Sequence, residues 1–388
     1  MRTTDVNPSL FDPLEDVLMS HFFPQVFGWK PATPDLRRRC GLPTRHGGLG
    51  IPIPSRLAIE ERAASSKLTE PLTAAILEQD DGYVEDLRGS RARRAQRQLE
   101  RDKALQAEGD GLAGLLSGRA ARGFEEARSR GGSAWLSFIP LESLGLDLDA
   151  ETFRDAIALR MGQELPHPLP STCPSCGEKM SISHALKCKK GGWVNRRHRE
   201  VLKAWMRYLE KGGATSVTEE PYLLPVPPGA SVRPTTIRET DARADIACRH
   251  GGRTTFLDIA VIDTGADSYI GKSTAQILED TEKRKNAKYL DRISPHGSFT
   301  PLVCSIYGTL GPAASMTAHR VARNVDPDRD ERDAVLDLHH VMLQAAILKA
   351  TSLCLRARAW SALPKVSAVP SLEDHTGWLA EAGARADI

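Results

Sequence analysis

A two-glycine turn lies between two predicted β-strands in the second half of the chain. The first strand covers residues 244–248, where apolar residues alternate, and the second covers 254–262, where β-branched residues are frequent. The turn residues Gly251-Gly252 tolerate the positive φ angles that a two-residue hairpin loop requires. With these glycines at the centre of the turn, His250 pairs with Arg253. The sequence therefore predicts a β-hairpin of fixed register.

This register places two aspartates, Asp245 and Asp258, directly opposite each other with Cβ atoms about 5 Å apart. Opposed carboxylates repel, so a protein that contains such a pair usually holds a cation between them or shares a proton. Oxygen ligands of this kind suit Mg²⁺, and the pair predicts a magnesium site for phosphodiester hydrolysis. The alternative interpretation is a solvated hairpin with both aspartates facing water. A slip of one residue would also undo the pairing.

Four residues in the middle of the chain have the spacing of a metal site: Cys173, Cys176, His184 and Cys188. The first two form a C-x-x-C turn, and the last two are four residues apart, so one helical turn presents both to the same ion. Three thiolates and one imidazole close a tetrahedral zinc shell, which is typical of a structural site and not of a catalytic one. The alternative is free thiols in a loop. An odd total of seven cysteines also favours a metal site in a reducing compartment over disulfides.

The net charge of +2 does not by itself indicate a nucleic-acid-binding protein, so any such surface must be local. One basic patch surrounds the cysteines and is suited to phosphates. It comprises Lys187, Lys189, Lys190, Arg196, Arg197 and Arg199. A second basic segment, Arg91 to Arg101, predicts either a solvated linker helix or a phosphate-contacting surface.

No apolar run approaches the length of a membrane span, and the N-terminus lacks an apolar signal core. We therefore expect a protein without a transmembrane segment that is not secreted, located in the nucleus or elsewhere inside the cell.

The pattern along the chain predicts a mostly helical first part and a mixed α/β second part. The expected units are a mostly helical region at 1–165 with an Arg-rich linker at about 85–130, a zinc knuckle at 170–192, an α/β core at 195–325, and a C-terminal helix with a loose tail at 326–388. Helices are expected at 11–27, 55–79, from about 149, and at 195–210, 272–291, 314–324 and 333–358; further strands are expected at 216–223 and 299–307. The glycines of residues 42–51 predict a structural turn, because the segment lacks the spacing of a phosphate loop.

Residues 195–325 have the expected order helix, strand, hairpin with two aspartates, helix with lysines, strand and helix. This order resembles the core of PD-(D/E)xK nucleases, an α/β fold with a small mixed sheet flanked by helices. With the upstream motifs, the chain resembles the C-terminal region of non-LTR retrotransposon reverse transcriptase polyproteins, which joins a CCHC zinc knuckle to a restriction-like endonuclease. The matching residues are Leu42-Pro-x-Arg-x-Gly-Gly-Leu-Gly50, the Cys-Cys-His-Cys set, Arg197-His198, Glu220-Pro221, Ala244-Asp245, Asp258, Lys285-x-x-Lys288-Tyr289 and the segment 297–303.

The resemblance implies roles for individual residues. Asp245 and Asp258 would hold Mg²⁺, Glu220 would add a ligand, and Lys285 or Lys288 would orient the attacking water or neutralise charge. The implied nucleic-acid contacts are Lys189, Lys190, Arg196, Arg197 and Tyr289. The sequence departs from the family pattern at Ala244, where a proline is usual, and at Ala260, where a lysine is expected. The lysines of the following helix would replace the latter.

The implied activity is Mg²⁺-dependent nicking of DNA, which primes reverse transcription of the element's RNA. DNA is the expected partner, the element RNA is a further candidate, and the oligomeric state stays open. The Tyr-x-Asp-Asp turn of a reverse transcriptase is absent, and Asp80-Asp81 lacks that context. We therefore expect the C-terminal part of a longer protein or a truncated product. One alternative is a catalytically decayed nucleic-acid-binding module, which Ala260 favours; another is a purely structural zinc protein, which leaves the lysine cluster unexplained.

Overall fold

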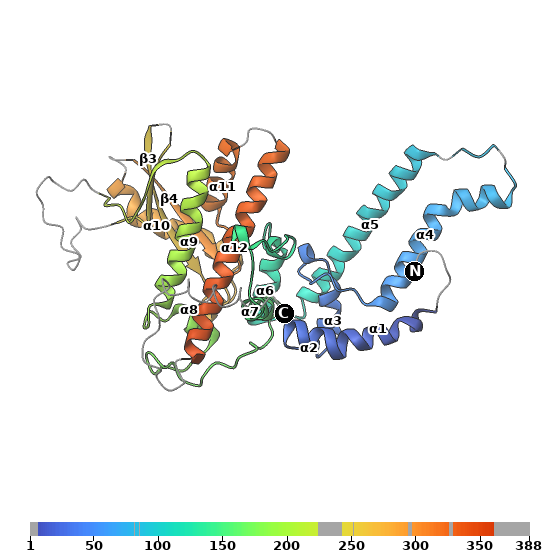
Figure 1. The fold of residues 1–388 in the computed structure, drawn as a ribbon, viewed down its shortest axis with the longest axis horizontal. Helices are drawn as coiled ribbons and strands as arrows, with labels where there is room; N and C mark the ends of the chain where they lie inside the picture. The colour runs from blue at the N-terminus through green and yellow to red at the C-terminus, as the bar shows by residue number, and fades with distance from the viewer. Residues whose placement is uncertain are drawn as a thin grey trace, which may run out of the picture.

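The computed structural model describes residues 7–80, 82–84, 86–223, 243–250, 252–293, 297–325 and 329–360. It combines an N-terminal set of helices with a small four-stranded mixed sheet that is covered by helices (Figure 1). The proline-rich residues 225–234 and the part of the predicted loose tail beyond residue 360 lie outside the described residues.

The N-terminal helical part packs around its own aromatic core. Its elements are η1 (Pro8–Phe11), α1 (Asp12–Val17), η2 (Leu18–Phe22), α2 (Phe23–Phe27), α3 (Pro34–Gly41), η3 (Thr44–His46), α4 (Pro54–Leu77), α5 (Leu87–Ala113), α6 (Gly118–Arg128), η4 (Ala134–Leu136), η5 (Glu142–Leu144) and α7 (Ala150–Met161). Phe23 and Phe27 pack against Ile157 and Met161 of α7 in this core. The helices predicted at 11–27, at 55–79 and from about 149 are confirmed.

The glycine-rich segment after α3 is a structural turn, as the sequence predicts. Arg39 donates hydrogen bonds to the carbonyl oxygens of Arg160 (2.7 Å) and Met161 (3.1 Å), and Arg160 donates in return to the Gly48 carbonyl (3.0 Å). A β-carbon at Gly48 would lie 1.9 Å from the Leu42 carbonyl oxygen, so only glycine fits there. The segment joins α3 to the end of α7, and its polar groups are used within the fold.

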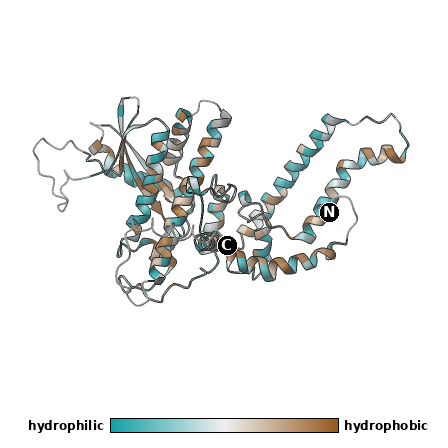
Figure 2. Ribbon diagram, viewed as in Figure 1, coloured by the Kyte–Doolittle hydropathy of each residue, from teal (hydrophilic) through white to brown (hydrophobic). Residues whose placement is uncertain are grey.

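Helices α4 and α5 project away from the rest of the molecule as a pair (Figure 1). Nearly all residues of 91–101 on α5 are exposed, and the helix is predominantly hydrophilic (Figure 2). This exposure is compatible with both interpretations of the basic segment, a solvated helix and a phosphate-contacting surface.

The second half of the predicted Arg-rich linker at 85–130 is instead a packed helix. Helix α6 buries Phe124, which is 1% exposed, and Glu126, which is fully buried. The Glu126 carboxylate accepts hydrogen bonds from Thr264 Oγ1 (2.5 Å) and Ser305 Oγ (2.8 Å), which follow or end two strands of the sheet. Arg119 of the same helix forms a 2.8 Å ion pair with Asp263. These long-range contacts, which the local arginine pattern does not reveal, join the helical part to the sheet.

Burial raises the pKa of Glu126, and the hydrogen bonds from Thr264 and Ser305 offset only part of that effect. The ionised form of Glu126 is therefore disfavoured in the folded state. The free energy of unfolding falls as pH rises above the pKa of Glu126 in the unfolded chain, about 4.3, and stops falling above its higher pKa in the folded protein. Relative to Glu126→Gln, the wild-type free energy of unfolding is expected to fall across this window by up to about 1.4 kcal/mol per pH unit.

Urea unfolding at a series of pH values measures this difference. Glu125→Gln is the matched control, because Glu125 is the adjacent carboxylate and its side chain is 43% exposed. Parallel pH profiles for the wild type and Glu126→Gln would contradict the prediction.

The sheet contains β1 (Thr215–Glu219), β2 (Ile246–His250), β3 (Arg253–Ile262) and β4 (Ser298–Ser305) in that spatial order. The first three strands are antiparallel neighbours, and β4 is parallel to β3 through the crossover helix α10 (Thr274–Ile293). The short η7 (Asp267–Tyr269) precedes α10. The predicted strand at 216–223 is shorter than expected, because β1 ends at Glu219; the helix and strand predicted at 272–291 and 299–307 are confirmed within two residues.

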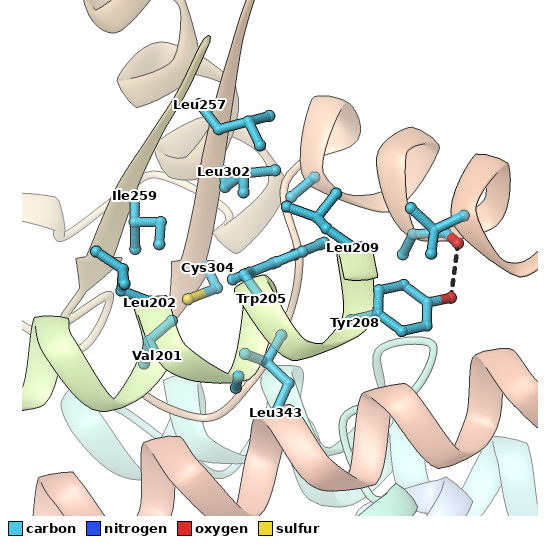
Figure 3. Packing of buried hydrophobic residues seen from close by; sticks show 14 of the residues in the cluster. Val201, Leu202, Trp205, Tyr208, Leu209, Leu257, Ile259, Leu302, Cys304 and Leu343 are labelled. Carbon is cyan, nitrogen blue, oxygen red and sulfur yellow. Dashed lines mark hydrogen bonds between the residues drawn. The ribbon is translucent and has the colours of Figure 1, made fainter. Parts of the chain in front are cut away.

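Each face of the sheet is covered by helices. One face packs against α9 (Trp193–Lys211), α11 (Pro312–Val325) and α12 (Arg329–Trp360), and Trp205 of α9 lies fully buried among strand residues (Figure 3). The same core includes Tyr208, whose hydroxyl donates to the Ala318 carbonyl (2.8 Å). The other face packs Ala247 and Phe256 against Tyr289 of α10.

Helix α12, the C-terminal helix predicted within residues 326–388, packs into this core. Leu343 and Ile347 pack with the α9 residues, and α12 runs beside α9 (Figure 1). In the described part of the chain, only the stretch Arg332–Arg358 of α12 is long and apolar enough to cross a membrane, but 67% of its most apolar window is buried in the fold. Such burial is that of a core helix, and no clear transmembrane segment is present among these residues.

Candidate active site and metal centre

Strands β2 and β3 pair in the predicted register from His250 and Arg253 as far as Ile246 and Leu257. The two aspartates, one residue further on, do not follow it. At Asp245 the chain bends and the regular pairing ends. The Asp245 N–H donates to the carbonyl of Leu257 (3.0 Å), so Asp245 lies opposite Leu257 instead of Asp258, its predicted partner. The prediction that Asp245 lies directly opposite Asp258 as a cross-strand pair is therefore wrong, because the ladder ends in a local bulge.

The bend brings the Asp245 carboxylate to the point where β2 leaves the sheet. Its Oδ2 atom accepts a 2.5 Å hydrogen bond from the Ile259 N–H of β3. The same oxygen lies 3.0 Å from His198 Nε2, on the second turn of α9. The carboxylate thus occupies the place that a strand carbonyl would otherwise fill, and it stays 22% exposed.

Asp258 lies on the face of the sheet that packs against α10. Its side chain is 5% exposed and pairs with the Lys285 ammonium group, which is 26% exposed. Tyr289, one helical turn further along α10, lies near this carboxylate and lowers its pKa. The crossover helix therefore brings a lysine and a phenol to the second aspartate.

Burial raises the pKa of Asp258; Lys285 and Tyr289 lower it in part, and Asp245 raises it further. Burial lowers the pKa of His198, but the hydrogen bond and charge of Asp245, with a contribution from Asp258, raise it overall. His198 contacts Asp245, Lys285 contacts Asp258, and the charges of these two pairs affect one another's pKa. We call these four residues the acid–lysine cluster.

Two further predicted catalytic residues have other partners. Lys288 donates to the Tyr289 hydroxyl (2.7 Å) and lies over the tyrosine ring. The Glu220 carboxylate lies 3.5 Å from Arg243 and is 61% exposed, while its backbone N–H donates to the Asp245 carbonyl (2.9 Å). Of the two candidate lysines, Lys285 is the one that contacts an aspartate. Glu220 supports the bend at Asp245 through its backbone.

The cysteine segment folds into a short hairpin followed by one helix. Cys173 N–H donates to the Glu178 carbonyl (2.7 Å), and Gly177 N–H donates back to the Cys173 carbonyl (2.8 Å), with Gly177 at a φ of 78° that suits glycine. Ser181 then caps α8 (Ile182–Lys187) through a 3.0 Å bond from the His184 N–H. This cap places His184 and Cys188 one turn apart, on the side of the C-x-x-C turn.

The ligand atoms of Cys173, Cys176, His184 and Cys188 lie within 4.8 Å of one another, and the described residues contain no second group of three or more His, Cys, Asp and Glu ligands this close. His184 Nε2 lies 3.2 Å from Cys176 Sγ, while Nδ1 lies 3.3 Å from a Glu178 carboxylate oxygen. A carboxylate on the outer nitrogen is the usual way to orient a histidine ligand. The set can therefore hold a metal such as zinc.

Burial raises the pKa of the Cys173 thiol, but hydrogen bonds from the Ser175 backbone and from His184 outweigh it and lower this pKa to about 6. Thiolate formation near neutral pH is what metal ligation requires.

Two predicted nucleic-acid contacts are buried, which corrects their assignment. Arg197 is 4% exposed and Tyr289 is 7% exposed, so neither side chain is available to a phosphate or a base. Lys189 and Lys190 are exposed, and Arg196 is half-buried against the Trp193 ring. Lys187 and Arg199 are exposed as well, so the accessible basic surface beside the metal ligands comprises Lys187, Lys189, Lys190, Arg196 and Arg199.

Sequence reasoning missed two residues beside the metal ligands, Glu178 and Arg358. Glu178 adjoins the C-x-x-C turn, so its closeness to His184 was accessible from local spacing. Arg358 lies at the far end of α12 and donates to Cys173 Sγ (3.3 Å), a contact for which the sequence contains no signal.

No protein-family model matches this chain, and no curated protein shows significant sequence similarity to it.

Proposed function

We propose that this chain is a metal-dependent DNA endonuclease of the restriction-like kind, joined to a zinc knuckle, as in the C-terminal region of non-LTR retroelement proteins. The observation that carries the proposal is the acid–lysine cluster, in which Asp258 and Lys285 are in contact beside Asp245. Two carboxylates and a lysine at the end of a hairpin and on its crossover helix match the order of a PD-(D/E)xK core. Lys285 supplies from α10 the positive charge that Ala260 lacks.

Asp245 and the buried Asp258 offer carboxylate oxygens, the ligand type that suits a magnesium ion, and the charge of Asp245 raises the pKa of Asp258. When bound, Mg²⁺ supplies charge stabilisation at the phosphate and lowers the pKa of its bound water. Lys285 holds the Asp258 carboxylate and presents an ammonium group beside the scissile phosphate. His198 and the Ile259 N–H hold the Asp245 carboxylate in place.

The Cys3His centre is proposed to bind zinc as a structural ion with no open coordination position. It would fix the accessible basic surface beside it against nucleic acid, since Lys189 and Lys190 follow its last ligand directly.

Plasmid nicking tests the proposal. Supercoiled DNA incubated with the purified chain is expected to become open-circular with Mg²⁺ and to stay supercoiled with EDTA. Retained DNA binding without nicking would contradict the nuclease proposal and favour a nucleic-acid-binding module.

The accessible basic surface is expected to bind DNA chiefly through phosphates. The triple variant Lys189→Ala/Lys190→Ala/Arg196→Ala is expected to reduce the slope of log K against log salt by about 0.9 for each phosphate that is no longer neutralised, and by up to about 2.7 in total. Fluorescence anisotropy at several salt concentrations measures the slope. Lys203→Ala is the control variant, because Lys203 is an exposed lysine of α9 that lies outside this patch and pairs with Glu200. A slope unchanged by the triple substitution would contradict this surface.

A further inference from the structure

A buried arginine from the far end of the fold contacts the metal ligands. Arg358, near the C-terminal end of α12, is fully buried. Its guanidinium donates to Cys173 Sγ (3.3 Å), to the Cys188 carbonyl (2.9 Å) and to the Lys190 carbonyl (2.8 Å). The planar fork of the guanidinium thus joins the first and last cysteine ligands and the residue that leads out of the knuckle.

The charge of this arginine is complementary to a loaded Cys3His centre. Zinc bound by three thiolates and a neutral imidazole has a net charge of about −1. A buried charge requires a partner, and a guanidinium beside a thiolate provides a charge-assisted hydrogen bond. Conversely, the buried Arg358 is stabilised by the negative centre, so the ion and the arginine favour each other's burial.

The same end of α12 contacts the start of α9. The Cys354 thiol donates to the Trp193 carbonyl (3.3 Å) at the first residue of α9. His198, which holds the Asp245 carboxylate, lies less than two turns further along α9. The end of α12 therefore contacts both the zinc knuckle and the start of α9, and α9 contacts the acid–lysine cluster through His198.

We propose that Arg358 is a positioning residue for the metal centre, through which metal loading is coupled to the docking of α12 and to the start of α9. The inference rests on the proposed zinc site. In the loaded state the guanidinium neutralises the centre and holds both carbonyl oxygens. Without the ion, this contact weakens, and the end of α12 and the first turns of α9 open more readily.

Four zinc-loaded proteins test this coupling: wild type, Arg358→Met, Arg358→Lys and Arg356→Met. Zinc release to a chromogenic chelator and amide hydrogen exchange over 193–198 and 354–358 are measured for each. Arg358→Met is expected to release zinc at least about 10-fold faster, as is typical when a group that orients a ligand is removed. It is also expected to exchange faster in both segments. Arg358→Lys keeps the charge without the fork and is expected to lie between the two.

Arg356→Met is the matched control, because this buried arginine two residues earlier pairs with Asp155 and not with the knuckle. Its zinc release is expected to equal that of the wild type. Release from Arg358→Met within about twofold of the wild type would overturn the coupling while the zinc site stands. If Arg358→Met does not fold, Arg358→Lys decides the matter, with wild-type release overturning the inference. A wild-type protein without stoichiometric zinc overturns the metal site itself, and this inference with it.

Discussion

Replacement of Asp258 by asparagine is expected to reduce Mg²⁺-dependent nicking by at least about 100-fold. Groups that merely orient a metal ligand contribute about 10- to 100-fold, and a direct ligand contributes more. The folded state is expected to tolerate the change. Burial raises the pKa of Asp258, so the ionised side chain is unfavourable in the fold at neutral pH, and asparagine removes that charge. Lys285 is 26% exposed and can be hydrated when its carboxylate partner is replaced.

Nicking and urea unfolding of the same preparation separate the two effects. The free energy of unfolding should be unchanged or slightly higher, and DNA binding through Lys189, Lys190 and Arg196 should persist. Asp280→Asn is the matched control, because Asp280 is an exposed aspartate of α10 that pairs with Lys272 outside the acid–lysine cluster. Equal nicking by Asp258→Asn and the wild type would remove the physical basis of the catalytic proposal.

Replacement of Cys188 by serine is expected to abolish stoichiometric zinc and to unfold the segment 171–190. Structural zinc contributes an apparent binding free energy of about 10–16 kcal/mol in small zinc domains, and that energy is coupled to local folding. The segment has one short helix of its own, α8 (Ile182–Lys187); apart from the ion, it is held by Ala185 and Leu186, which share a buried cluster with Leu355 of α12, and by the hydrogen bonds of Arg358. A strong chelator should produce the same local unfolding in the wild type.

Metal analysis and hydrogen exchange over 171–190 provide the measurements. Cys40→Ser is the control, because Cys40 is a buried cysteine of the N-terminal core and lies outside the ligand set. Its zinc content is expected to equal that of the wild type. A Cys188→Ser protein that still contains one zinc would contradict the assignment of Cys188 as a required zinc ligand.

The features predictable from sequence are those set by short-range geometry. The hairpin register follows from Gly251-Gly252, because a two-residue turn permits only one pairing of the strands that flank it. The Cys3His set follows in the same way, since a C-x-x-C turn and a four-residue helical spacing each bring two ligands together. The mixed α/β character and the helices α9, α10 and α11 follow from apolar periodicity.

The features that escaped prediction depend on contacts between distant residues. The bulge at Asp245 arises where β2 leaves the sheet and its carboxylate accepts the Ile259 N–H, which strand periodicity does not encode. The packing of α6 depends on hydroxyl groups at Thr264 and Ser305, more than a hundred residues away. The burial of Arg197 likewise depends on the tertiary packing of α9, whereas the sequence shows only a basic residue among others.

The contact between α12 and the knuckle also sets an order of events during synthesis. Cys173 and Cys188 emerge from the ribosome well before Arg358, which follows them by 185 and 170 positions. At a translation rate of about 5–20 residues per second, the nascent knuckle is without its arginine partner for about 10 to 35 s. During that interval the cysteine side chains are positioned only by the local turn and helix of the segment and by a bound metal ion. The final contacts of the centre thus form only after α12 has been synthesised.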